Sequence, residues 1–98
     1  MSKWKTEATD RLFEAILTLK TLEECHLFFE DACTIKEIQA ITQRFDVACK
    51  MSEGKNYQEV IKETGASSAT ISRVNKCVTY GEGGYKIAID RMKEAGKI

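Results

Sequence analysis

Residues 57–74 read YQEVIKETGASSATISRV, and this stretch decides the fold because it has the layout of a helix-turn-helix. We place the motif at about 56–76. Gly65 would end the first helix, since a tight turn needs a left-handed backbone residue and glycine has no Cβ to clash. Ala66 is small enough to lie inside the turn. Apolar side chains on the two helices are spaced to meet and to fix the angle between them, and they are Val60, Ile61, Ile71 and Val74.

The second helix of the motif begins with small, uncharged side chains. Such side chains let a helix enter the major groove, where hydroxyl groups can bond base edges or phosphates and a methyl group can touch thymine. Amides at the amino end can hold a phosphate, and Lys55, Lys62 and Lys76 would neutralise phosphate charge. The alternative is a helical hairpin that only packs two helices. The predicted DNA-binding residues are Gln58, Lys62, Ser67, Ser68, Ala69, Thr70, Ser72, Arg73 and Lys76.

The segments before the motif have the three- and four-residue apolar spacing of helices. A broad stripe near the amino terminus predicts a helix that a second copy of the chain, or an ordinary core, would cover. Capping-box patterns at 21–24 and 34–37 predict the starts of two more helices, the second ending near Gly54. The apolar residues of these helices are Trp4, Ala8, Leu12, Phe13, Ile16, Leu17 and Leu19, then Leu27, Phe28, Phe29 and Ala32, then Ile35, Ile38, Ile41, Phe45 and Ala48.

The motif and the carboxyl-terminal segment supply three more helices. The capping pattern recurs at 56–59, and either Ser67 or Ser68 can cap the next helix, which a run of glycines interrupts. A last helix is expected over about 85–95, and its apolar residues are Ile87, Ile89 and Met92. No segment alternates with a two-residue period for long enough to predict a strand. We therefore expect an all-α fold of six helices in a single domain, residues 1–98.

The composition is that of a folded helical protein rather than a disordered one, since 43% of the 98 residues are hydrophobic and 31% charged, with no proline. Fifteen basic and fifteen acidic side chains cancel, so the whole chain has no net charge that would attract nucleic acid or an anionic membrane. The charges are unevenly divided, however. Residues 1–49 carry a net charge of −3, and residues 50–98, which hold the motif, carry +3.

Few residues suggest catalysis or metal binding. The four cysteines are separated by 8, 16 and 28 residues, which favours buried or half-buried thiols in a reducing cytosol over a metal site. His26 follows Cys25 on a predicted helix, where neighbours point in different directions and cannot readily act as base and nucleophile. We therefore expect no enzyme. No apolar run resembles a signal peptide or approaches the roughly 18 residues of a membrane span, so we expect a cytoplasmic protein.

Over residues 21–76 the chain resembles the tryptophan repressor superfamily, and within it the TrpR-related YerC/YecD family. The resemblance rests on Thr34, on Gln43 and Arg44 in the long helix, and above all on GASSATISR at 65–73. It implies an intertwined all-α homodimer in which helices of two chains interlock and two reading heads project to one side. It also implies binding of double-stranded DNA at half-sites about one helical turn, roughly 34 Å, apart.

The resemblance also implies a candidate ligand site. In tryptophan-binding members an indole lies between two arginines, and a threonine helps to hold the amino acid; the matching residues are Arg44, Arg73 and Thr34. Guanidinium planes stack on aromatic faces and pair with carboxylates, so L-tryptophan or another aromatic amino acid is the effector to test. The position after the second arginine is a small glycine in those members and Val74 here. Its two added methyl groups would obstruct an indole.

Each candidate ligand residue also has an explanation that needs no effector. Thr34 can cap a helix, and Arg73 can bind phosphate directly. Arg44 can pair with Asp46 or Glu37.

These observations together predict a sequence-specific DNA-binding transcriptional regulator, a repressor, that binds a palindromic operator as a homodimer. A small effector could modulate it. The alternative is a helical dimerisation or adaptor module that uses the amino-terminal apolar helices to bind another protein. A DNA binder should lose affinity steeply as salt rises, because counterions are released on contact, whereas an adaptor should give no nucleic-acid signal at any salt.

Overall fold

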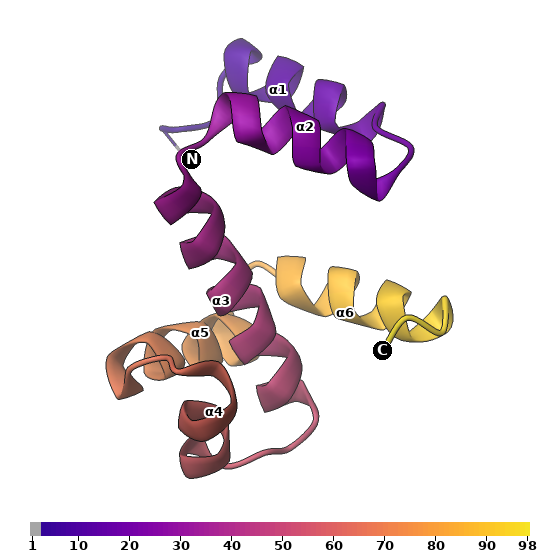
Figure 1. Ribbon diagram of the computed structural model, residues 1–98. Coiled ribbons are helices and arrows are strands. Elements are labelled where there is room, and N and C mark those ends of the chain that lie inside the picture. The colour runs from indigo at the N-terminus through magenta and orange to yellow at the C-terminus, as the bar shows by residue number, and fades with distance from the viewer. Residues whose placement is uncertain (1–2) are drawn as a thin grey trace. The chain divides into compact units, whose positions relative to one another are not determined.

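A computed structural model describes residues 3–98 of the chain, and within that range it is built from helices without a strand (Figure 1). The all-α prediction is therefore confirmed, and the described range holds the six helices expected from the sequence. The helices are α1 (Glu7–Leu17), α2 (Leu22–Ala32), α3 (Ile35–Ser52), α4 (Tyr57–Thr64), α5 (Ser68–Tyr80) and α6 (Gly84–Glu94).

The chain divides into two compact units, with the boundary between Ile38 and Gln39 in the first third of α3. The first unit holds α1, α2 and the start of α3. Neither α1 nor α2 has a buried residue. The rings of Phe28 and Phe29 contact each other edge-on, with 5.4 Å between their centroids. The first unit therefore leaves much of its apolar surface uncovered within one chain.

Polar caps fix where the early helices begin. The Thr34 hydroxyl accepts the Glu37 amide at 3.1 Å, and the Glu37 carboxylate accepts the Thr34 amide at 2.8 Å, so this capping box is complete as predicted. These bonds lower the pKa of Glu37. At Thr21 the box is only half formed, because Glu24 accepts the amide of Lys20 rather than that of Thr21.

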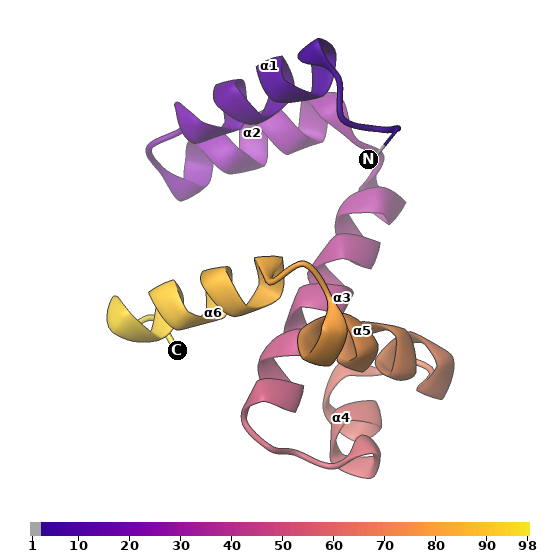
Figure 2. The same ribbon diagram turned by 180° about the vertical axis from the view of Figure 1, so that it is seen from behind.

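The second unit contains a core to which four helices contribute. Its buried residues are Val47 and Ala48 from α3, Val60 from α4, Ala66 from the turn, Ile71 and Val74 from α5, and Ile89 from α6. Within this unit α5 contacts both α4 and α6, and α4 lies beside α5 from the front and from behind (Figure 2). The core thus holds the two helices of the predicted motif against the long helix α3.

The apolar stripe predicted for α3 is correct only in part. Ala48 is fully buried and Phe45 packs against the core, but Ile35 is 62% exposed and Ile41 49% exposed. Val47, which was not part of the predicted stripe, is fully buried. A helix of 18 residues can present two neighbouring faces to different partners, and its own sequence does not say which face the motif covers.

Candidate nucleic-acid interface

The corner between α4 and α5 is built as the sequence predicts. Asn56 and Glu59 form a complete capping box at the start of α4, with bonds of 2.9 and 3.2 Å. Gly65 ends the helix in the left-handed region at φ 71°, and its amide donates to the Ile61 carbonyl at 2.9 Å. Ala66 follows and is only 3% exposed. The chain can therefore turn sharply between two short helices.

Buried apolar contacts set the angle between the two helices of the motif. Val60 and Ile71 are fully buried and Val74 is 2% exposed, so these three form the expected wedge. The prediction that Ile61 would join them is wrong, because Ile61 is 37% exposed and lies outside the core cluster. The two residues are adjacent on α4, and neighbours on a helix point about 100° apart, so only one can face α5.

A polar brace behind the corner was missed from the sequence. The Thr64 hydroxyl donates to the Val60 carbonyl at 2.7 Å and accepts the Ala66 amide at 3.2 Å. The Thr64 carbonyl accepts the side-chain amide of Gln43, on α3, at 3.3 Å. Thr64 and Gln43 are 21 residues apart, and no periodicity or capping pattern connects positions at that distance. The fold alone brings them together.

The amino end of α5 is exposed and lacks charged side chains in its first turn. Ser67 is the cap: its hydroxyl accepts the Thr70 amide at 3.1 Å and donates to the Thr70 hydroxyl at 3.1 Å. Ser68 and Ala69 lie exposed beside it. Further along, the exposed predicted contacts are Ser72, Arg73 and Lys76, whereas Thr70 is half-buried.

The lysines predicted to flank this surface differ in their contacts within the chain. Lys62 and Gln58 are exposed on α4, as a role in DNA contact would require. Lys55 is instead engaged within the chain, since its ammonium lies 2.7 Å from the Glu63 carboxylate. That bond raises the pKa of Lys55 and lowers the pKa of Glu63. Lys55 can neutralise a phosphate only by giving up part of this ion pair.

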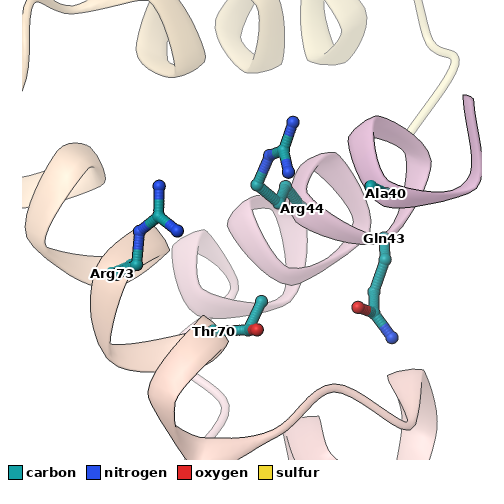
Figure 3. A pocket seen from close by; sticks show the side chains of 5 residues that line it. All are labelled: Ala40, Gln43, Arg44, Thr70 and Arg73. Carbon is teal, nitrogen blue, oxygen red and sulfur yellow. The ribbon is translucent and has the colours of Figure 1, made fainter. Parts of the chain in front are cut away.

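The two candidate ligand arginines share one open pocket. It measures about 120 Å³ and is lined by Ala40, Gln43, Arg44, Thr70 and Arg73. Figure 3 shows that the guanidinium groups of Arg44 and Arg73 point to the same side of α3 and α5, whereas the Gln43 amide points away from them. Two cations beside one hollow could bind an anion or stack on an aromatic ring.

The other two residues implied in ligand binding are not among those that line the pocket. Thr34 belongs to the first unit and caps α3. Val74 is buried in the core and does not line the pocket, so its methyl groups do not fill the space between the arginines. Asp46 lies 3.6 Å from Lys50, and within residues 3–98 neither it nor Glu37 forms an ion pair with Arg44.

Residues 3–98 offer neither a metal site nor a membrane span. No group of three or more His, Cys, Asp or Glu side chains in residues 3–98 could hold a metal ion. All four cysteines are free thiols; Cys25, Cys33 and Cys49 are half-buried, but Cys77 is exposed, so the prediction of a buried or half-buried thiol is wrong there. Burial is the largest cause of the raised pKa of Cys49. None of the helices described is both long enough and apolar enough to cross a bilayer.

Comparison with known proteins gives consistent matches over nearly the whole chain. The family model described as Trp repressor protein matches residues 7–93. The uncharacterized protein YerC of Bacillus subtilis (strain 168) is 51% identical over 94 residues, which are 96% of this chain and 90% of that protein.

Two solved structures have the same fold. A candidate Trp repressor from Staphylococcus aureus aligns with a TM-score of 0.89 and 46% identity, covering 93% of this chain and 91% of that one. A TrpR like protein from Eubacterium eligens ATCC 27750 aligns with a TM-score of 0.89 and 49% identity, covering 93% of this chain and 94% of that one.

Proposed function

The chain belongs to the Trp repressor protein family, and from that premise we propose that it is a sequence-specific DNA-binding regulator of transcription that acts as a repressor. The family consists of regulators and not of enzymes, so the prediction of a non-enzymatic protein is confirmed. We propose a cytoplasmic location, as expected from the sequence, because such a regulator acts where the DNA is.

The observation that carries the proposal is the amino end of α5. Ser68 and Ala69 are exposed there, the first turn carries no acidic residue, and the helix behind them is held by the buried pair Ile71 and Val74. A slim, uncharged helix end can enter the major groove, where its hydroxyl and methyl groups meet base edges. The exposed cations Lys62, Arg73 and Lys76 would hold the flanking phosphates.

A second copy of the chain is part of the proposal. Leu17 is 82% exposed, Leu22 80% and Leu27 58%, all on α1 and α2. When a partner covers such apolar side chains, their removal from water stabilises the complex by about 25 cal/mol for each Å² buried. A two-fold dimer would present two copies of α5, and its operator would be a palindrome whose half-sites are separated by about one DNA turn, roughly 34 Å.

A small effector is the third part. The pocket that holds Arg44 and Arg73 is lined by α3 and α5, and its lining includes Thr70, a predicted DNA contact. A ligand bound there would change the position or mobility of the side chains that face DNA. We propose L-tryptophan or another aromatic amino acid as the effector, because two guanidinium groups match a carboxylate and an aromatic plane.

The decisive experiment is selection of bound sequences from random duplex DNA, with and without tryptophan and related aromatic amino acids. The proposal predicts enrichment of a symmetric site. A titration of the selected duplex against salt should then show affinity falling steeply, as expected when counterions are released. A different enriched site or affinity in the presence of one amino acid would identify the effector.

A helical adaptor that binds another protein is the second candidate function. The exposed leucines of α1 and α2 favour it, because they would suit a foreign helix as well as a second copy. An adaptor would yield no enriched DNA sequence and no salt-dependent DNA signal. A symmetric site would exclude it as the main function.

A further inference from the structure

Gln43 connects the long helix to the corner of the helix-turn-helix. Its side-chain nitrogen donates to the Thr64 carbonyl at 3.3 Å, and the bond is partly buried. A partly buried carbonyl that loses its donor is costly, because water replaces the bond incompletely. The bond therefore holds the last residue of α4 at a fixed place along α3.

The Thr64 side chain forms hydrogen bonds with residues on both sides of the corner. Its hydroxyl donates to Val60, one turn back in α4, and accepts the amide of Ala66, which comes after Gly65. The turn glycine lies between two residues that Thr64 holds. Moving Thr64 relative to α3 would therefore redirect the chain that enters α5.

Gln43 also borders the pocket between the two arginines. It precedes Arg44 in α3 and lines the same hollow as Thr70 and Arg73. Its amide points away from both guanidinium groups (Figure 3). One side chain thus lies beside the pocket and binds the corner of the reading head.

We propose that Gln43 is a positioning residue for DNA recognition, whose amide fixes the aim of α5 by binding Thr64. The inference rests on the proposed function, since it concerns how the same site reads DNA. Bonds to base edges require correct distance and angle, whereas attraction to phosphates tolerates a misplaced helix. Loss of Gln43 should therefore reduce specific binding more than non-specific binding.

The test compares Gln43→Met and Gln43→Glu with the same changes at Gln39, which is exposed on α3 about one turn earlier. The Met variant removes the donor at similar length, and the Glu variant places an oxygen against the Thr64 carbonyl. At a temperature well below melting, the ratio of affinities for the selected operator and a scrambled duplex should fall about threefold to tenfold in both Gln43 variants. It should stay near the wild-type ratio in both Gln39 variants. Equal ratios at both positions would overturn the proposal.

Amide hydrogen exchange tests the same brace without DNA. Protection at residues 64–68 should fall in Gln43→Met relative to Gln39→Met, while protection in the core of α5 is kept. A wild-type chain that binds no duplex would refute the proposed function, and the exchange data would still report whether Gln43 orders the corner. Unchanged protection in Gln43→Met would rule the brace out.

Discussion

Two neighbouring serines at the start of α5 differ in their contacts within the chain. Ser67 is used within the chain as the helix cap, and Ser68 is exposed next to it. We predict that Ser68→Glu abolishes operator binding and leaves the fold intact. A carboxylate repels phosphate, while a negative charge in the first turn of a helix is favourable. Fluorescence anisotropy on the selected duplex and thermal melting would measure the two effects separately.

The control for Ser68→Glu is Ser68→Ala, which removes the hydroxyl without adding charge and should weaken binding far less. Ser67→Ala provides the opposite contrast, because loss of the cap should cost about 1 kcal/mol of stability. Operator affinity unchanged in Ser68→Glu would contradict the assignment of α5 as the recognition helix.

Glycine is required at position 65 because of its backbone conformation and not because a side chain there would clash. Its φ is 71°, and a Cβ built there would meet nothing within 4 Å. We predict that Gly65→Val lowers the free energy of unfolding by about 1 to 3 kcal/mol, because a β-branched residue is strained in the left-handed region. Urea denaturation would measure it. Gly84→Val is the matched control, since a Cβ there is also unopposed and its φ is ordinary. A loss as large as that of Gly65→Val would refute the backbone explanation.

At the scale of elements, α4 offers a neighbouring pair with opposite environments. Val60 is fully buried in the wedge against α5, and Ile61 is 37% exposed. We predict that Val60→Ala lowers stability by about 2 kcal/mol through lost burial and a cavity. Ile61→Ala removes more atoms and should nonetheless cost less. If chemical denaturation showed the larger loss at Ile61, the packing of the motif described here would be wrong.

Ion pairs connect α4 to the end of α3 and to the loop that follows it. Glu63 lies 2.7 Å from Lys55 and 3.6 Å from Lys50. The hydrogen bond with Lys55 lowers the pKa of Glu63 below its unfolded value, so the contribution is complete above about pH 4.3 and is lost as pH falls through the folded pKa. The raised pKa of Lys55 keeps its own contribution in place until pH rises past about 10.4.

We therefore predict that Glu63→Gln destabilises the chain at neutral pH and that the difference from wild type shrinks as pH drops below about 4. Melting curves at several pH values would follow it. Glu82→Gln, in the exposed connection between α5 and α6, should show no such pH-dependent difference. A constant difference from pH 7 to pH 3 would exclude the ion pair as its cause.

The starts and ends of helices could be predicted because they depend on nearby residues. The errors concern burial, which depends on contacts between segments far apart in the sequence. Capping at Thr34, Asn56 and Ser67 and the break at Gly65 depend on residues three or four apart, and each is found in the structure. The sequence allows either Ser67 or Ser68 to cap α5, and Ser67 does so. Val47 was missed because burial on α3 depends on which face the motif covers.

At the scale of the whole molecule, the candidate site also has one part that the motif predicts and another that it does not. The exposed end of α5 follows from the motif, but the pocket joins Arg44 to Arg73 across 29 positions and was expected only from the family resemblance. Gln43 belongs to the pattern that carries that resemblance, yet its bond to Thr64 has no sequence signal. The net charge is zero, so the DNA binding proposed for this chain would depend on local cations around α5.

The exposed leucines of the first unit give the last prediction. Leu17 and Leu22 flank the connection between α1 and α2 and are 82% and 80% exposed within one chain. Replacing both by Gln removes almost nothing from the fold of a monomer, so any loss must come from a contact between copies. We predict that the wild type sediments as a dimer and that this double variant sediments as a monomer at the same concentration.

Operator affinity of the same variant should fall sharply, since one reading head makes half of the contacts with a palindromic site. The melting temperature of the wild type should rise with protein concentration, and that dependence should vanish in the variant. Thr18→Gln, an exposed polar site on the same connection, is the control and should remain dimeric. A double variant that stays dimeric would place the interface elsewhere and leave the leucines open to a different protein.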